Sequence, residues 1–139
     1  MQLSAHLTFA GRCEAAFKFY EQVLGGRIMT MLSYGNSPTA AQVPSEWREK
    51  IVHATLALGD TVLAGVDVLP EQYERPQGFF VLLETADALR TERMFHALAE
   101  GGDVRMPIQK TFWSPAFGVL VDQFGIPWEF SCGQTTTSA

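Results

Sequence analysis

The sequence contains one short motif twice, about 76 residues apart. Residues 19–26 read FYEQVLGG and residues 95–102 read FHALAEGG. Both copies are typical of the last turns of an amphipathic helix, and a following glycine pair is a common helix stop because glycine adopts the left-handed conformation that closes the last turn. The repeat therefore predicts two copies of one structural module within the 139 residues of the chain.

Each predicted helix is preceded by an extended apolar segment and followed by a strand-like segment and a hairpin. In the first copy these are Leu3–Phe9, the helix Cys13–Leu24, Arg27–Ser33, and a hairpin over residues 53–66 that turns at Gly59 and Asp60. In the second copy they are residues 79–83, a helix over 88–99, Asp103–Gln109, and a hairpin over 117–132 that turns near residues 123–125. This order is βαβββ, twice.

Apolar residues at helical spacing predict which side of each helix is buried. The predicted stripes are Ala16, Phe19, Tyr20 and Val23 in the first helix, and Leu89, Met94, Phe95 and Leu98 in the second.

The predicted fold class is α+β: tandem βαβββ modules form curved, antiparallel-rich mixed sheets around a cleft, with the helices outside. We expect one domain over residues 1–135, with module one at 1–69, a proline-framed linker at 70–77 and module two at 78–132. The small polar residues 133–139 predict a flexible tail. A cleft between duplicated halves is where a ligand is expected.

Composition argues against several classes of partner. The formal net charge is −5 and the Lys and Arg residues are scattered, so the basic surface typical of nucleic-acid binding is missing from the sequence. No apolar stretch approaches the roughly 20 residues that a membrane span needs, and the start lacks a basic region followed by an apolar run. We therefore expect a cytoplasmic protein with no nucleic-acid or membrane partner.

Two local features have alternative interpretations. Cys13 follows Arg12 at a predicted helix start, an arrangement that can lower the pKa of a thiol, although a small residue there is also a common cap. The long segment 34–50 contains Trp47, whose amphipathic side chain could cover a cleft or meet a partner subunit.

Several stretches resemble the vicinal oxygen chelate superfamily, which includes glyoxalase I, bleomycin-resistance proteins and extradiol dioxygenases, and within it the PhnB-like branch. The resembling stretches are residues 7–16 with Phe19 and Tyr20, then His53-Ala54, Thr111-Phe112-Trp113, Phe117-Gly118 and residues 122–128. The resemblance implies a homodimer, for which sheets with exposed edges give a physical reason.

In metal-dependent members, the resemblance implies a divalent cation held by His, Glu or Gln side chains from the first and last strands of the modules. Glu129 occupies one such position. The other three fall on Ser4 or Ala5, on Leu63 or Ala64, and on Gly78 or Phe79, none of which is a family ligand. One ligand cannot hold an ion, so the usual metal site is predicted to be lost or rebuilt.

A rebuilt site would involve His6. Strand alternation places His6 and Thr8 on the face opposite Leu7 and Phe9, toward the expected cleft. With Glu129, His6 could form half of a metal site or an acid–base pair. The alternative is that His6 makes a hydrogen bond to Thr8 or to a facing backbone group.

Phe112 and Trp113 lie in a turn-rich stretch and could form a wall for a planar or apolar ligand, or plug the space between modules. The predicted function is a PhnB-like protein that binds a small organic molecule in an aromatic-lined cleft through His6, Thr8, Phe112, Trp113 and Glu129. The alternatives are a divalent-metal-dependent lyase, isomerase or dioxygenase that uses Glu129 and His6 as metal ligands, and a resistance protein that sequesters a drug or metabolite. Catalytic residues are not identified.

Overall fold

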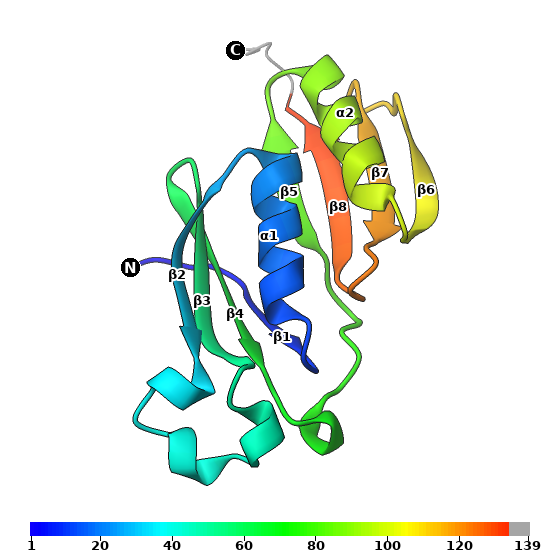
Figure 1. Ribbon diagram of the computed structural model, residues 1–139. Coiled ribbons are helices and arrows are strands. Elements are labelled where there is room, and N and C mark those ends of the chain that lie inside the picture. The colour runs from blue at the N-terminus through cyan, green and yellow to red at the C-terminus, as the bar shows by residue number, and fades with distance from the viewer. Residues whose placement is uncertain (134–139) are drawn as a thin grey trace. The chain divides into compact units, whose positions relative to one another are not determined.

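The computed structural model describes residues 1–133, which form two compact units, Met1–Glu74 and the chain from Arg75 onward. In the described chain, each unit consists of one α-helix against one four-stranded mixed sheet, as Figure 1 shows. The α+β class and the doubled βαβββ order are those predicted from the sequence. Apart from Gly133, the tail predicted at 133–139 lies outside the described residues.

The first unit has the sheet order β1-β4-β3-β2. Strand β1 pairs in parallel with β4, and the other pairs are antiparallel. The elements are β1 (His6–Phe9), α1 (Cys13–Leu24), β2 (Arg27–Ser33), β3 (Ile51–Leu58) and β4 (Thr61–Asp67). Strand β1 is shorter than predicted, because its ladder with β4 starts at the pair His6 and Ala64 and leaves Leu3 exposed outside it.

The second unit repeats this topology with the order β5-β8-β7-β6. Its elements are β5 (Val81–Thr85), α2 (Ala88–Ala99), β6 (Asp103–Gln109), β7 (Phe117–Val121) and β8 (Pro127–Cys132). Strand β5 begins two residues later than predicted, since its parallel ladder with β8 starts at Val81 opposite Trp128. Phe79 and Phe80 therefore precede the strand. Neither α1 nor α2 has the length and apolar character that crossing a membrane requires.

The repeated glycine pairs have two separate roles. Gly25 and Gly101, the first of each pair, have φ of 79° and 73°, the left-handed conformation that lets the chain leave the helix. The second of each pair lies against the hairpin backbone. A Cβ on Gly26 would be 2.6 Å from the Ala57 carbonyl oxygen, and one on Gly102 would be 2.5 Å from that of Val121. The motif is thus explained by a helix stop and a close backbone approach.

The buried side of α1 includes the predicted Ala16 and Tyr20 but contains a different phenylalanine. Phe17 is fully buried, whereas the predicted Phe19 is only half-buried. The ring of Phe17 lies edge-on to Phe9 and tilted against Tyr20, with centroids 6.3 and 5.9 Å away. It fits because Gly65 below it has no side chain: a Cβ there would lie 2.5 Å from the Phe17 ring. The apolar spacing alone could not show this glycine contact.

In α2 the predicted Met94, Phe95 and Leu98 are buried, but Leu89 is exposed. As in α1, a phenylalanine of α2 packs at a strand glycine. Phe95 packs edge-on against Phe130, 5.6 Å between centroids, and a Cβ on Gly118 would lie 2.7 Å from its ring. In both units, a helix phenylalanine approaches a strand closely where the strand has a glycine.

Asp67 ties the first unit together. Its buried carboxylate accepts hydrogen bonds from the backbone N–H groups of Gly11 (2.8 Å) and Cys13 (3.0 Å) through Oδ1, and from Ile51 (2.9 Å) through Oδ2. The residue before α1, Arg12, gives no side-chain cap, so a residue 54 positions from Cys13 along the chain caps this helix. Asp67 thereby joins β4 to the start of α1 and the start of β3.

In the second unit Asp122 and Ser114 have comparable roles. The buried Asp122 carboxylate accepts from the N–H groups of Phe124 and Ile126 and from Nε1 of Trp128. Ser114 Oγ lies within 2.9 Å of the carbonyl oxygens of both Ala116 and Cys132. These bonds fix the β7–β8 turn and the segment that leads into β7.

Because Phe17 is fully buried and Phe19 is not, the two alanine substitutions should differ. We expect Phe17→Ala to lower the free energy of unfolding by about 3–5 kcal/mol, and Phe19→Ala by clearly less, measured by urea denaturation. Equal losses would show that the helix register described here is wrong.

Candidate functional site

Each sheet has one face covered by a helix and one open face, which alternation along the strands defines. In the second sheet, Trp128 and Phe130 of β8 lie on the helix side with Leu120 and are buried. Alternate residues lie on the open face. One row across its ladder is Leu82, Glu129, Val119 and Met106, and the next row is Glu84, Ser131, Phe117 and Gln109.

A hollow of about 450 Å³ lies on this open face. Its floor comes from the strands through Val119, Val121 and Pro127. Its walls are the segment before β5 and one residue of β6: Arg75, Pro76, Gln77, Gly78, Phe79, Phe80 and Arg105. The volume falls within the range of roughly 300–1,000 Å³ typical of small-molecule sites.

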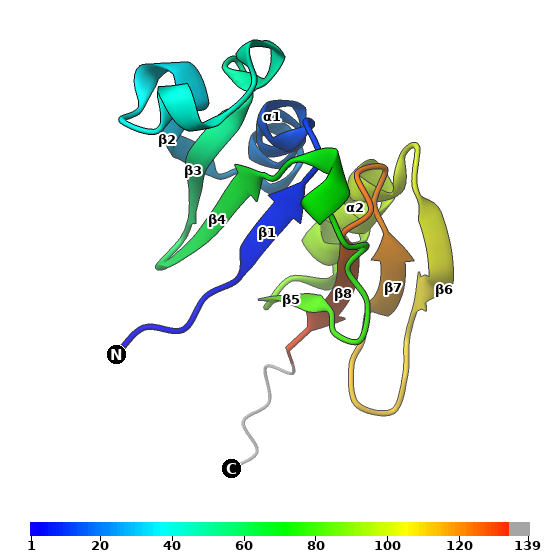
Figure 2. The same cartoon turned by 90° about the horizontal axis from the view of Figure 1, so that it is seen from below.

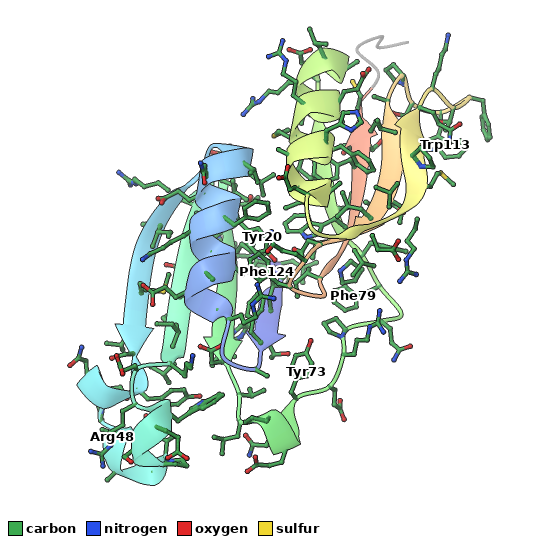
Figure 3. All side chains as sticks on the ribbon, turned by 45° about the vertical axis from the view of Figure 1, so that its right-hand side comes forward. Tyr20, Arg48, Tyr73, Phe79, Trp113 and Phe124 are labelled. Carbon is green, nitrogen blue, oxygen red and sulfur yellow. The ribbon has the colours of Figure 1, made fainter. Side chains whose placement is uncertain are left out.

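Phe79 and Phe80 are the large apolar side chains of the hollow. Both remain about half exposed, at 47% and 48%. They follow Gly78, whose φ of 87° turns the chain just before it enters β5, and Figure 3 shows Phe79 on this segment. Two phenyl groups left accessible beside a cavity are candidates for ligand contact.

Phe112 and Trp113 lie before β7, at the other end of the same sheet, where Figure 3 labels Trp113. Ser114 and Thr111 close the turn that presents them, through bonds from Thr111 N to Ser114 O (2.8 Å) and from Ser114 N to Thr111 Oγ1 (3.1 Å). Trp113 stacks edge-on between Phe112 and Phe117, with centroids at 4.6 and 5.2 Å. Phe112 is 93% exposed. The pair does not line the hollow.

Glu129 lies on the open face between these two features. It pairs with Val119, a floor residue of the hollow, on one side and with Leu82 on the other. Among the predicted site residues, the second unit thus places Glu129, Phe112 and Trp113 on one sheet. That a ligand contacts them stays a prediction.

His6 and Thr8 lie on the open face of the first sheet. His6 is exposed and pairs with Ala64, which pairs in turn with Thr55 and so with Thr30. This row therefore has small and polar side chains where the row with Leu82, Val119 and Met106 in the second sheet has larger apolar ones. His6 makes no side-chain hydrogen bond to any residue in 1–133, so the predicted bond to Thr8 or to backbone does not form within the first unit.

Glu129, the one residue at a ligand position of the superfamily, and His6, the candidate for a rebuilt metal site, each stand without a second ligand in the described part of their own unit. His6 is beside Ala64, and Glu129 is beside Leu82, so each sheet offers one donor with an apolar neighbour. Across residues 1–133, no three His, Cys, Asp or Glu side chains come together as metal ligands. A stable divalent site needs several converging donors, and these side chains do not fit one. A shared site of His6 and Glu129 stays a prediction.

Cys13 is not the activated thiol that its position beside Arg12 could indicate. It is fully buried. Burial, together with the nearby carboxylates of Asp67 and Glu14, raises the pKa of its thiol. The thiolate is therefore disfavoured, and Cys13 acts as a packed helix-start residue.

The 34–50 segment forms three short 3₁₀ turns at the ends of β2 and β3, as Figure 2 shows. Trp47 and Lys50 pack over Gly11, and Lys50 Nζ donates to the Gly11 carbonyl at 3.1 Å. The indole Nε1 of Trp47 is buried without a hydrogen-bond partner among the described residues. Within the first unit, the segment covers the loop before α1.

Sequence reasoning missed Phe79, Phe80, Arg75 and Arg105 as site residues. The sequence predicts a strand at Phe79, a linker at Arg75 and a strand at Arg105. The available signal was the sequence Gly78-Phe79-Phe80, in which a glycine interrupts an apolar run just before a strand.

The folds and sequences of known proteins agree with this architecture. The chain is 40% identical to protein PA1353 from Pseudomonas aeruginosa, whose crystal structure matches it with a TM-score of 0.85 over 96% of this chain and 98% of that one. Protein YjdN from Escherichia coli (strain K12) is 32% identical over 136 residues, 92% of each chain. A PhnB protein from Bacillus cereus, titled a putative 3-demethylubiquinone-9 3-methyltransferase, shares the fold at a TM-score of 0.79 with 21% identity, over 96% of this chain and 100% of that one.

Residues 4–130 match the family model of the Glyoxalase/Bleomycin resistance protein/Dioxygenase superfamily. The chain belongs to this superfamily, and its structural neighbours include PhnB-like proteins.

Since neither unit gathers a multi-ligand site, metal should contribute little to folding. We expect EDTA treatment to leave the thermal midpoint unchanged within about 2 °C, because no metal-binding free energy is lost. Differential scanning fluorimetry tests this. A large drop in the midpoint that one equivalent of a divalent ion reverses would contradict it.

Proposed function

We propose that this protein binds a small organic molecule on the open face of its second sheet, in the hollow beside Phe79 and Phe80. The observation that carries the proposal is the hollow of about 450 Å³, floored by apolar strand residues and walled by two half-exposed phenyl groups. Accessible aromatic area beside a concave site favours ligand binding. The molecule would lie against Val119 and Val121 and contact one or both phenyl rings.

The same face gives a longer ligand further contacts. Beyond Val119 come Glu129 and then the aromatic pair Phe112 and Trp113, of which Trp113 packs on the buried Phe117. We propose this face, with the hollow at one end, as an aromatic-lined binding site that includes Glu129, Phe112 and Trp113 of the predicted set. Contacts to His6 and Thr8, a homodimeric assembly and a cytoplasmic location are further proposals that rest on the sequence and on the superfamily.

Of the competing functions, binding without metal chemistry is favoured over a metal-dependent lyase, isomerase or dioxygenase. The reason is the donor set: among residues 1–133, no three His, Cys, Asp or Glu side chains come together as metal ligands. A drug- or metabolite-sequestering protein needs only the hollow and its aromatic walls. We propose no catalytic step.

A neutral aromatic probe tests this proposal. N-phenyl-1-naphthylamine, whose fluorescence rises in apolar surroundings, should bind one site per chain. Phe79→Ala and Phe80→Ala should each weaken its binding about five-fold or more, because each removes apolar contact area worth roughly 1 kcal/mol. Both side chains are half exposed, so the fold should persist.

Leu89→Ala is the matched control. Leu89 is an apolar residue of α2 with 56% exposure, and its helix covers the opposite face of the sheet. This substitution should leave the titration unchanged. Probe affinity that is equal in all four proteins would refute binding in the hollow.

A further inference from the structure

We infer that the ligand of the second sheet is an organic anion: an apolar body with one negatively charged group, held by Arg75 and Arg105. The inference rests on the proposed binding function and adds the chemical class of the ligand. It comes from the charge distribution around the hollow rather than from its shape.

The ten residues that line the hollow include two arginines and no carboxylate. Arg75 enters at the start of the wall segment and Arg105 from β6. Arg75 forms no ion pair with any residue in 1–133. In a protein with a formal net charge of −5, two cations facing one cavity without an acidic lining residue are a local reversal of charge. Such an arrangement attracts anions.

Arg105 lies at a β-bulge in β6, which positions its side chain. Val104 pairs with Leu120 and Met106 with Val119, so β6 advances two residues where β7 advances one. Arg105 is the extra residue. A bulge commonly redirects a side chain at the edge of a sheet, and here the redirected guanidinium lines the hollow.

Asp103 orients the Arg105 guanidinium by a hydrogen bond from Nε only. The Nε of Arg105 donates to Asp103 Oδ2 at 2.7 Å, and both side chains are exposed. Arginine has five N–H donors in a planar fork, so the donors on its two terminal nitrogens stay available to a carboxylate, sulfonate or phosphate group. Asp103 offsets part of the charge of Arg105, which leaves Arg75 as the stronger electrostatic contributor.

The other lining residues indicate the chemistry of the uncharged part of the ligand. Phe79, Phe80, Pro76, Val119, Val121 and Pro127 offer apolar surface, and Gln77 is the one neutral polar side chain of the lining. A hydrated ion such as free phosphate would leave this surface uncovered. Glu129, beside Val119, carries a negative charge at the strand side of the hollow. The anionic group is thereby directed toward the two arginines and the apolar body toward the strands.

The test compares two probes that differ by one anionic group. Anilinonaphthalene-1-sulfonate is N-phenyl-1-naphthylamine with a ring sulfonate added. The wild-type protein should bind the sulfonate about five-fold or more tightly than the neutral probe, as a partly exposed charge contact allows. Raising the salt to about 0.5 M should weaken binding of the sulfonate only, because salt screens exposed charges.

Variants locate the effect. Arg75→Gln and Arg105→Gln should each weaken sulfonate binding about three- to ten-fold while the neutral probe changes less than about two-fold. Arg93→Gln, which removes an exposed arginine from α2, is the matched control and should change neither. Glu129→Gln should leave sulfonate binding equal or tighter.

The outcomes separate the two proposals. If the neutral probe binds in the hollow but the sulfonate binds no better, or if Arg75→Gln and Arg105→Gln have no effect, the anionic class is wrong and the binding site stands. If neither probe responds to Phe79→Ala or Phe80→Ala, the proposed function itself fails.

Discussion

In a four-stranded sheet covered by a helix on one side only, the packing of that helix leaves the second face uncovered within its unit. Both units of this protein have that construction, and each is held by a buried carboxylate that bonds to backbone or indole N–H groups: Asp67 in the first and Asp122 in the second. On the helix-covered face of each sheet, a helix phenylalanine packs against a strand glycine: Phe17 against Gly65 and Phe95 against Gly118. The open faces are therefore where the two copies can diverge.

They have diverged in chemistry while keeping the fold. The first open face presents small and polar residues such as Thr30, Thr55 and Ala64, and the second presents Leu82, Met106 and Phe117 with a hollow at one end. The two copies share what folding needs: the glycine pair after the helix and the close contact between a helix phenylalanine and a strand glycine. Ligand binding depends instead on the open-face residues, which differ between the two copies.

Repetition and strand alternation were sufficient to predict the fold from sequence. The helix Cys13–Leu24 and the strands Arg27–Ser33 and Asp103–Gln109 have the predicted bounds. A glycine pair marks one end of each of them: Gly25-Gly26 lies between the helix and the first strand, and Gly101-Gly102 precedes the second strand. The stripe of α1 was wrong at Phe19, since the choice between Phe17 and Phe19 depends on Gly65, a residue far away in sequence. Arg105 could not be predicted, because its direction follows from a bulge that only the pairing of β6 with β7 reveals.

The central claim is that ligand binding belongs to the open face of the second sheet. Amide chemical shifts of ¹⁵N-labelled protein titrated with anilinonaphthalene-1-sulfonate test it most directly, because they locate the probe residue by residue. The account predicts the largest shifts at Gly78, Phe80, Arg105, Val119 and Val121, with none of similar size along α1 or β3. Shifts centred on the first sheet, around His6 and Thr55, would contradict it.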